Sequence, residues 1–339
     1  MSVEKKERQA ADCPVEVEKL TTRLNINETS RSEVPSTDFY DPCPGVPLPN
    51  VDDFYNGIKQ LRPNANILYN RFKYGKSPDD VSKPKISSLF EKFSAVVDVN
   101  PNATLDEVLR LTNFSKEDRI ELERMTRGQV DNPQWFHYRK GMLTASKFYE
   151  ACHMLPSTNP ERFVRSILSD SNTFGGNIPA PLRYGLQNET NARKLFMRDH
   201  KKHHKHVVFE DQGLTISEEH IFIGASPDGL ISCKQCGKFL LEVKCMYSKR
   251  NFHPKIAARD HCFMDDEKIL HLDPKSKWYA QIQGQLGICK FDLCKLVMYT
   301  NKGIHVVDVH FDLSFWKEME AKLVEFYTLR VGPAMLALL

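Results

Sequence analysis

The chain has 339 residues, of which 41% are hydrophobic and 27% charged, and its formal net charge is +3. A chain of this length and composition folds around its own core without disulfide bonds. No apolar run approaches the roughly 18–20 residues that cross a bilayer, so we expect no membrane span. The charged start MSVEKKERQA also lacks the apolar segment of a secretory signal. The nine cysteines are scattered, which favours free thiols and a location in the nucleus or cytoplasm.

The chain divides into three parts by composition. Residues 1–50 are rich in polar residues and end in DPCPGVPLPN, which predicts a disordered tail. Residues 51–130 carry helical spacings of apolar residues, the clearest beginning at Leu105, and are predicted to form a helical N-terminal region. Residues 131–339 are predicted to form the main domain.

The predicted elements of the main domain alternate between helices and strands. Two helical segments come first, followed by five short strand-like runs, a helix, two further strands and a C-terminal helix. In chain order they are helices 145–155 and 187–199; strands 206–210, 214–217, 220–226, 229–232 and 239–245; helix 276–289; strands 296–300 and 304–311; and helix 313–329. This order predicts an α/β fold with a central mixed β-sheet flanked by helices.

The segment SPDGLISCKQCGKFLLEVKC, residues 226–245, carries the most informative polar residues. Asp228 stands where one strand ends at Pro-Asp-Gly, and the next strand contains Glu242 and Lys244. Because side chains alternate along a strand, Glu242 and Lys244 point to the same face. The CKQCGK turn lets the two strands pair as a hairpin, which would bring Asp228 beside Glu242.

Two carboxylates and a lysine on one face suit a divalent metal ion. Carboxylates this close repel each other unless a cation lies between them. Oxygen ligands favour Mg²⁺, with Mn²⁺ as a substitute. Such an ion activates water and stabilises charge on a phosphodiester, while Lys244 would position or deprotonate that water. The alternative is a solvent-facing hairpin with a surface Glu–Lys pair.

Four sequence blocks follow one another between residues 135 and 286. They are WFHYRKGMLTASKF from Trp135, RYGLQNETNARKLF from Arg183, GASPDGLI with LLEVKC, and WYAQIQGQL from Trp278. Together they resemble the YqaJ-type viral recombinase family, whose best-known relative is the exonuclease of phage lambda, over roughly residues 130–300. The resemblance implies a PD-(D/E)xK, restriction-endonuclease-like nuclease core in residues 131–339. It also implies processive 5′→3′ digestion of one strand of duplex DNA.

The resemblance further implies a set of metal ligands. Asp228 and Glu242 would bind the metal directly, and Glu189 would join them directly or through water. The Val243 carbonyl is a further candidate ligand, since it lies between the two key residues of the strand.

Two more residues of the resemblance would act on the attacking water. Lys244 would contact that water, and Gln281 would help to orient it. Without the resemblance, Gln281 and Gln285 would be interpreted as a hydrogen-bonded pair four residues apart on a helix.

The resemblance also implies a pocket for a 5′-terminal phosphate, formed by Arg139, Ser146 and Ser226. Arginine suits bidentate phosphate contacts, and the two hydroxyls add neutral donors. Trp135 would stack on a base or wedge the duplex apart. Without the resemblance, Arg139 would be a surface charge, Ser146 a structural residue and Trp135 a core or interface aromatic.

The expected function is a Mg²⁺-dependent 5′→3′ exonuclease that acts on 5′-phosphorylated ends of double-stranded DNA. Its product would be 3′ single strands for recombination or repair. The resemblance implies a single-strand annealing protein as partner, and either a monomer or a ring-shaped trimer. Two alternatives stay open: a structure-selective endonuclease with the same core, and a catalytically inactive DNA-binding module.

Cys233 and Cys236 form a C-x-x-C turn, with His203, His204 and His206 shortly before it. A structural zinc site needs four ligands in a tetrahedron, and the sequence has no second C-x-x-C. We therefore expect a polar turn with two free thiols rather than a structural Zn²⁺.

A basic stretch precedes this turn. Residues 193–206 hold six Lys or Arg, four His and one acid. Such a stretch fits either a contact with a phosphate backbone or a solvated, lysine-rich helix end.

Overall fold

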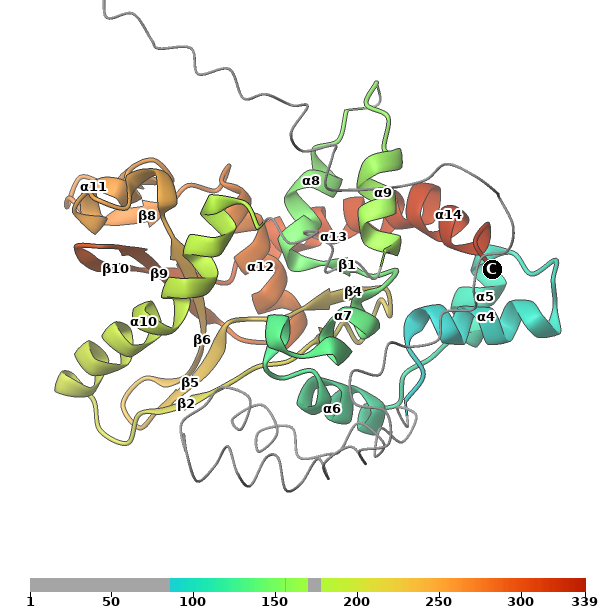
Figure 1. The fold of residues 1–339 in the computed structure, drawn as a ribbon, viewed down its shortest axis with the longest axis horizontal. Coiled ribbons are helices and arrows are strands. Elements are labelled where there is room, and N and C mark those ends of the chain that lie inside the picture. The colour runs from blue at the N-terminus through green and yellow to red at the C-terminus, as the bar shows by residue number, and fades with distance from the viewer. Residues whose placement is uncertain (1–85, 156, 170–177) are drawn as a thin grey trace, which may run out of the picture. The chain divides into compact units, whose positions relative to one another are not determined.

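The computed structural model describes residues 86–155, 157–169 and 178–339. The predicted tail, residues 1–50, lies outside the described residues, as does the first part of the predicted helical region, up to residue 85. Figure 1 shows a sheet with helices packed on it and a further group of helices beside it. The prediction of an α/β fold with a central mixed sheet flanked by helices is therefore confirmed.

Five strands form the main sheet in the order β10-β9-β6-β5-β2. Strands β6 and β9 run parallel, and the other three pairings are antiparallel, so the sheet is mixed. The strands are β2 (Val208–Glu210), β5 (Gly229–Cys233), β6 (Gly237–Cys245), β9 (Leu293–Thr300) and β10 (Gly303–His310).

Two smaller sheets complete the strand content of the described residues. One has the order β1-β4-β3, and the other is the hairpin β7-β8. Their strands are β1 (Leu143–Thr144), β3 (Thr215–Ile216), β4 (Ile223–Ala225), β7 (Cys262–Met264) and β8 (Leu270–Leu272). The sequence analysis missed β1, β7 and β8, because two or three residues are too few for an alternating pattern to show.

The helices before the main sheet begin at clear sequence signals. Each of α4, α5 and α6 starts with a capping box, in which a Ser or Thr and an acid three residues later bond reciprocally to the backbone. These and the following helices are α4 (Leu89–Val99), α5 (Leu105–Leu111), α6 (Lys116–Met125), α7 (Pro133–Arg139), α8 (Phe148–Cys152) and α9 (Glu161–Leu168). Short 3-10 turns η2 (Gln129–Asp131) and η3 (Ala145–Lys147) lie between them.

The later helices are α10 (Ala180–His203), α11 (Pro254–Ala258), α12 (Lys277–Cys289), α13 (Leu313–Phe326) and α14 (Gly332–Leu336). Among them, α10 extends beyond its predicted bounds at both ends, while α12 agrees with its prediction to within one residue. A π-helical turn, Tyr327–Val331, joins α13 to α14, so the C-terminal helical stretch continues beyond the predicted end at residue 329. None of the helices in the described ranges is long and apolar enough to cross a membrane.

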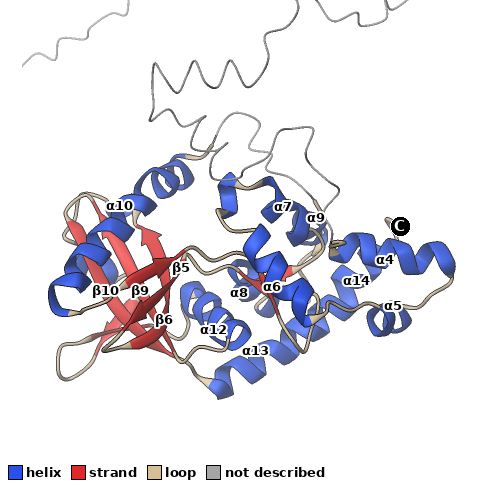
Figure 2. Ribbon diagram, turned by 90° about the horizontal axis from the view of Figure 1, so that it is seen from below, coloured by secondary structure: helices blue, strands red, loops and turns tan. Residues whose placement is uncertain are grey.

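The main sheet is buried on both faces. Phe239, Leu241 and Val243 of β6 pack with Phe196 of α10 in one hydrophobic cluster. Leu240, on the opposite face of the strand, packs in a second cluster with residues of α12. Figure 2 shows α10 and α12 on different sides of the sheet. Alternating side chains of β6 thus serve two cores.

The helices α4, α5 and α6 share the third hydrophobic cluster with the main domain. Leu89, Val108 and Leu122 from these helices are fully buried together with Leu143 and Phe148. The segment described from residue 86 onwards is therefore packed on the domain that follows it. The predicted domain boundary at residue 131 stays a prediction.

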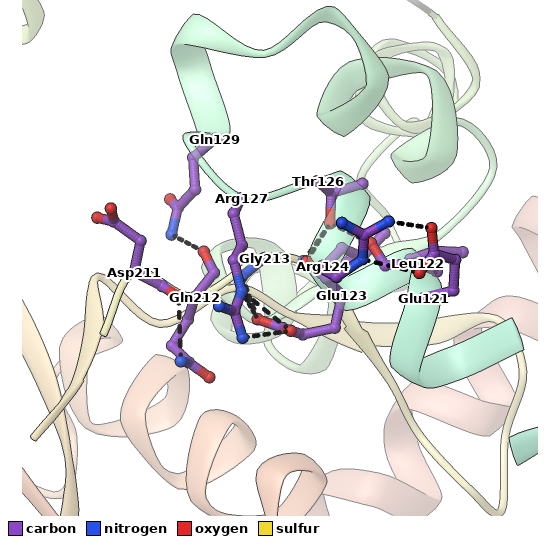
Figure 3. A network of polar contacts seen from close by, with 11 residues as sticks. Glu121, Leu122, Glu123, Arg124, Thr126, Arg127, Gln129, Asp211, Gln212 and Gly213 are labelled. Atoms are coloured by element: carbon purple, nitrogen blue, oxygen red, sulfur yellow. Dashed lines mark hydrogen bonds and ion pairs between the residues drawn. The ribbon is translucent and has the colours of Figure 1, made fainter. Parts of the chain in front are cut away.

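A network of polar contacts ties α6 to the loop between β2 and β3 (Figure 3). The Glu123 carboxylate accepts a hydrogen bond from the Gly213 N–H at 2.9 Å, and Arg127 holds that carboxylate by an ion pair of 2.9 Å. Beyond them, Gln129 Nε2 donates to the carbonyl oxygens of Gln212 at 3.1 Å and Pro227 at 2.7 Å. The network therefore fixes the backbone immediately before Asp228.

The contact at Gly213 leaves no room for a side chain, so Gly213→Ala should destabilise the fold. A Cβ there would lie 1.8 Å from the Glu123 carbonyl oxygen, which belongs to the backbone and cannot rotate away. We expect a loss of about 1–3 kcal/mol in the free energy of unfolding, measured by urea denaturation. Gly185→Ala in α10 is the control, because a Cβ there meets nothing within 4 Å. This variant should raise the free energy of unfolding by about 0.5–1 kcal/mol. Equal stability of the two variants would contradict the packing described.

Candidate active site

The hairpin of β5 and β6 brings the predicted acidic residues together. Its register pairs Gly229 with Leu241, which places Asp228 beside Glu242. Asp228 Oδ2 accepts a hydrogen bond from the Val243 N–H at 2.7 Å, so the carboxylate is held against the neighbouring strand. The Pro-Asp-Gly sequence lets the chain enter β5 at this point.

Glu242 is the most buried acid of the site, with a relative exposure of 2%. Its Oε1 accepts hydrogen bonds from Lys244 Nζ and from Gln281 Nε2, both at 2.6 Å. Its Oε2 accepts from Gln285 Nε2 at 2.8 Å. The alternative of a solvent-facing hairpin is therefore wrong, because α12 covers the Glu–Lys face and supplies two of the three donors.

Gln285 is a site residue that the sequence analysis assigned to a helix pair. Gln281 and Gln285 do lie on one face of α12, but both donate to the same carboxylate of β6. Gln281 also accepts from Lys244 Nζ at 3.0 Å, which closes a ring of contacts with Glu242. The four-residue spacing indicated a shared face, and only the tertiary packing revealed what that face meets.

Three carboxylates crowd the site when no cation is bound. Burial raises the pKa of Asp228 well above its usual range, and the charges of Glu242 and Glu189 add to the increase. Burial likewise raises the pKa of Glu189, against the opposing charge of Arg193, whose guanidinium lies 3.5 Å from it. A divalent cation between these carboxylates would offset their mutual repulsion and favour their ionised, metal-binding forms.

Lys244 carries the balancing charge. Burial lowers its pKa, but the neighbouring carboxylates of Glu242 and Asp228 outweigh burial, and the pKa ends above its ordinary value. The ammonium group is therefore retained and points at Glu242 and Gln281. The Val243 N–H is used by Asp228, while the role of the Val243 carbonyl as a ligand stays a prediction.

Three of the four residues predicted to bind the 5′ phosphate or the DNA bases are connected to one another. Arg139 donates to Thr144 Oγ1 at 2.9 Å, and its guanidinium carbon lies 3.7 Å from the centre of the Trp135 ring. Trp135 Nε1 donates to Ser226 Oγ at 3.0 Å. Because Ser226 is two residues before Asp228, this arrangement and the carboxylate site share one loop.

Arg139 is a half-buried cation. Burial lowers its pKa to about 10, which leaves it charged at neutral pH, and in the described part of the chain no acidic side chain offsets this charge. Lys147, which the sequence analysis did not single out, is a second cation of this region. Burial lowers its pKa to about 8, and the positive charge of Arg139 contributes to that decrease. Ser146 lies exposed on η3, directly before Lys147.

Trp135 is half-buried and packs against the third hydrophobic cluster. Arg139 covers one side of its ring, and Phe136 meets it edge-on at 4.9 Å between ring centres. The ring therefore orients Arg139 and Ser226 in this structure. Its predicted stacking on a base stays a prediction.

The chain is similar to known proteins in sequence and in fold. The family model described as YqaJ-like viral recombinase domain matches residues 134–292. This match covers just under half of the chain, and the matched residues are called the YqaJ-like domain below. The family resemblance seen in the four sequence blocks is thereby confirmed, and the YqaJ-like domain contains every predicted site residue.

The YqaJ-like domain also has a viral relative. Over 142 residues the chain is 24% identical to the shutoff alkaline exonuclease of Alcelaphine herpesvirus 1 (strain C500). The match covers 41% of this chain and 28% of the relative, so it spans under a third of the relative's length.

Two solved structures show distant likeness. An alkaline exonuclease from Laribacter hongkongensis has a TM-score of 0.44 and 21% identity, covering 60% of this chain and 94% of its own. The shutoff and exonuclease protein from Kaposi's sarcoma-associated herpesvirus has a TM-score of 0.46 and 13% identity, covering 85% and 94%.

The crowding of carboxylates predicts that Asp228→Asn stabilises the metal-free protein. A carboxyl whose pKa is raised in the folded state contributes stability that is lost as pH rises through that pKa, so Asp228 opposes folding increasingly as pH rises. The asparagine keeps an acceptor for the Val243 N–H and removes the charge. We expect a higher Tm in a chelator at pH 7, by roughly 2–4 °C per kcal/mol of relief.

The matched control is Asp308→Asn. Asp308 accepts from Lys295 at 2.7 Å outside the carboxylate cluster, so its loss should leave Tm unchanged or slightly lower. Added Mg²⁺ should raise the Tm of the wild type more than that of Asp228→Asn. A lower Tm for Asp228→Asn in chelator would show that the carboxylate is not under electrostatic strain.

Proposed function

We propose that this protein is a metal-dependent DNA exonuclease that digests one strand of linear duplex DNA in the 5′→3′ direction. The observation that carries the proposal is the meeting of Asp228, Glu242 and Lys244 beneath α12. Two residues before Asp228, Ser226 bonds to Trp135, whose ring in turn contacts Arg139. The names of the herpesvirus and Laribacter relatives, both exonucleases, support the same activity. The 3′ single strands left behind would serve recombination or repair.

Asp228 and Glu242 would hold Mg²⁺, or Mn²⁺ in its place, with Glu189 reaching the ion directly or through water. The fit rests on the donor set, which is all oxygen, and on the raised pKa of Asp228 and Glu189. When bound, the ion lowers the pKa of a water molecule and stabilises negative charge on the phosphodiester.

The remaining site residues position the reacting groups. Lys244 holds a positive charge 2.6 Å from Glu242 Oε1, where it can contact the attacking water and screen the developing negative charge. Gln281 bonds to both Glu242 and Lys244, so it fixes their relative orientation and can orient the same water. Gln285 keeps Glu242 Oε2 in place from the buried side.

The positive charges of Arg139 and Lys147 support action from a phosphorylated 5′ end. Arg139 is positively charged without an acidic partner among the described residues, and Lys147 adds a second charge. Arginine forms charge-assisted, bidentate bonds to phosphate, and Ser146 and Ser226 offer hydroxyl donors nearby. An endonuclease has no use for a pocket that selects a terminal phosphate.

A single-strand annealing protein would be the natural partner, because it takes up the 3′ single strands that such a reaction exposes. A monomer and a ring-shaped trimer both fit the proposal, since the proposed reaction needs only one chain's residues.

The proposal is tested by digesting a linear duplex with one phosphorylated 5′ end in Mg²⁺, with a covalently closed circle alongside. Fluorescent labels at each end report polarity. We expect progressive loss of the strand from its phosphorylated 5′ end and an intact circle. Lys244→Ala should abolish cleavage while binding to the duplex survives, because only the charge at the reacting centre is removed.

Each other result assigns a different function. Cutting of the circle would make the protein a structure-selective endonuclease. Binding of duplex without cleavage in Mg²⁺ or Mn²⁺ would make it a DNA-binding module. Full activity of Lys244→Ala would remove this hairpin from the reaction.

The terminal-phosphate pocket has its own test in Arg139→Gln. The variant should lose its preference for a 5′-phosphate over a 5′-hydroxyl end by about 10–100-fold, the size of a charge-assisted contact worth about 1.5–3 kcal/mol. The control is Arg124→Gln on the exposed face of α6, where the arginine pairs only with Glu121 and the preference should persist. Equal losses on both kinds of end would count against the pocket.

A further inference from the structure

A second group of metal-ligating side chains lies at the far end of the β5–β6 hairpin. Cys233 and Cys236 flank its turn, and His200 and His204 lie at the end of α10. One ligand atom from each of the four residues lies within 4.8 Å of the other three. None of the residues proposed for cleavage belongs to this group.

The separations between these atoms fit a tetrahedral zinc ion. Zn–S bonds of about 2.3 Å and Zn–N bonds of about 2.0–2.1 Å place neighbouring ligand atoms about 3.3–3.8 Å apart. Cys236 Sγ lies 3.1 Å from His204 Nδ1 and 3.9 Å from His200 Nε2, and Cys233 Sγ lies 3.5 Å from His204 Nδ1. All three distances lie close to the range expected for atoms bound to one zinc ion. Polar groups that meet by chance on a surface have no reason to show these separations.

The helix side of the group is preorganised. His200 and His204 are four residues apart, so they project from one face of α10, and their rings stack at 4.0 Å with 9° between the planes. Phe196, one turn earlier, stacks on His200 at 5.3 Å. The imidazole rings are therefore held in place by packing rather than free in solvent.

The hairpin side is preorganised as well. The backbone N–H groups of Gln235 and Cys236 donate to the Cys233 sulfur, which holds that sulfur in place in the turn. Gly237 has a φ of +75°, which glycine adopts without strain and which turns the chain back into β6. The Gln235 side chain accepts from the Lys205 N–H at 3.1 Å, so the turn is also tied to the end of the helix.

We propose that His200, His204, Cys233 and Cys236 bind one structural Zn²⁺. Neither cysteine forms a disulfide in the structure. The zinc proposal departs from the expectation of a polar turn with two free thiols. Of the three histidines named from the sequence beside this turn, only His204 belongs to the group, and His200 was not among them. The second pair of ligands comes from a helix that the fold lays beside the hairpin.

The zinc would join the same two elements that meet at the candidate active site. Glu189 and His200 are eleven residues apart on α10, about 16 Å along one face of the helix. Asp228 and Cys233 are five residues apart along the hairpin, a similar length of about 17 Å. Phe196 and Ile231 fill the space between helix and strand. The ion would therefore fix the helix to the hairpin at the end opposite the carboxylates.

Metal content of the purified full chain tests the proposal independently of any nuclease activity. Protein prepared under reducing conditions without chelator should contain about one zinc per chain. Replacement by Co²⁺ should give the ligand-field and thiolate charge-transfer bands of a tetrahedral site. Cys236→Ser and His204→Asn should each lower the zinc content to roughly a tenth or less.

Three variants serve as matched controls. His203→Asn changes the neighbouring, exposed histidine, and Cys262→Ser changes a half-buried cysteine of β7; both should keep the zinc. Asp228→Asn should also keep it, which separates this site from the proposed Mg²⁺ site. A strong chelator should lower the Tm of the wild type and of these three variants, but not that of Cys236→Ser.

The proposal fails if the reduced wild-type chain contains no zinc and gives no tetrahedral Co²⁺ spectrum. It also fails if His203→Asn loses zinc as completely as His204→Asn, or if Cys233 and Cys236 form a disulfide in the reduced preparation. Loss of DNA cleavage with full zinc content would contradict the proposed nuclease function and leave the zinc site standing.

Discussion

The burial of Glu242 between β6 and α12 is the interaction on which the candidate active site depends. A carboxylate with 2% exposure is tolerated only when its oxygens are bonded. Here Lys244, Gln281 and Gln285 supply the donors. These contacts satisfy the acid and hold its orientation, and they also bring the lysine to the place where a water would react. The same bonds that stabilise the fold therefore build the site.

The loop before β5 connects this site to the rest of the molecule. Gln129, held beside α6, bonds to the Pro227 carbonyl, and Trp135 bonds to Ser226. The position of Asp228 is thus set by contacts from segments about a hundred residues earlier in the chain. These contacts tie α6 and η2 to the YqaJ-like domain. Helix α6 shares its hydrophobic core, and η2 joins it through the polar contact of Gln129.

Helix α10 and the β5–β6 hairpin run together from the carboxylates of the candidate active site to the group of His and Cys side chains at the other end. At one end lie Glu189 and Asp228, where crowded charges disfavour the metal-free fold. At the other end lie His200 and Cys233, for which we propose a structural ion. A fixed far end would let the hairpin and helix carry electrostatic strain at the near end without separating, because the core between them includes Phe196 and Ile231.

The sequence by itself determined the alternating faces of β6, and with them the common direction of Glu242 and Lys244, because strand periodicity is local. The capping boxes of α4 to α6 are likewise formed by residues close together in the sequence. The four sequence blocks indicated the YqaJ-like family. Only the tertiary structure decided that α12 covers the acidic face, that Gln285 bonds to Glu242, and that His200 meets Cys236. These contacts join residues 36 to 43 positions apart, and no local pattern specifies which helix face will pack on which strand.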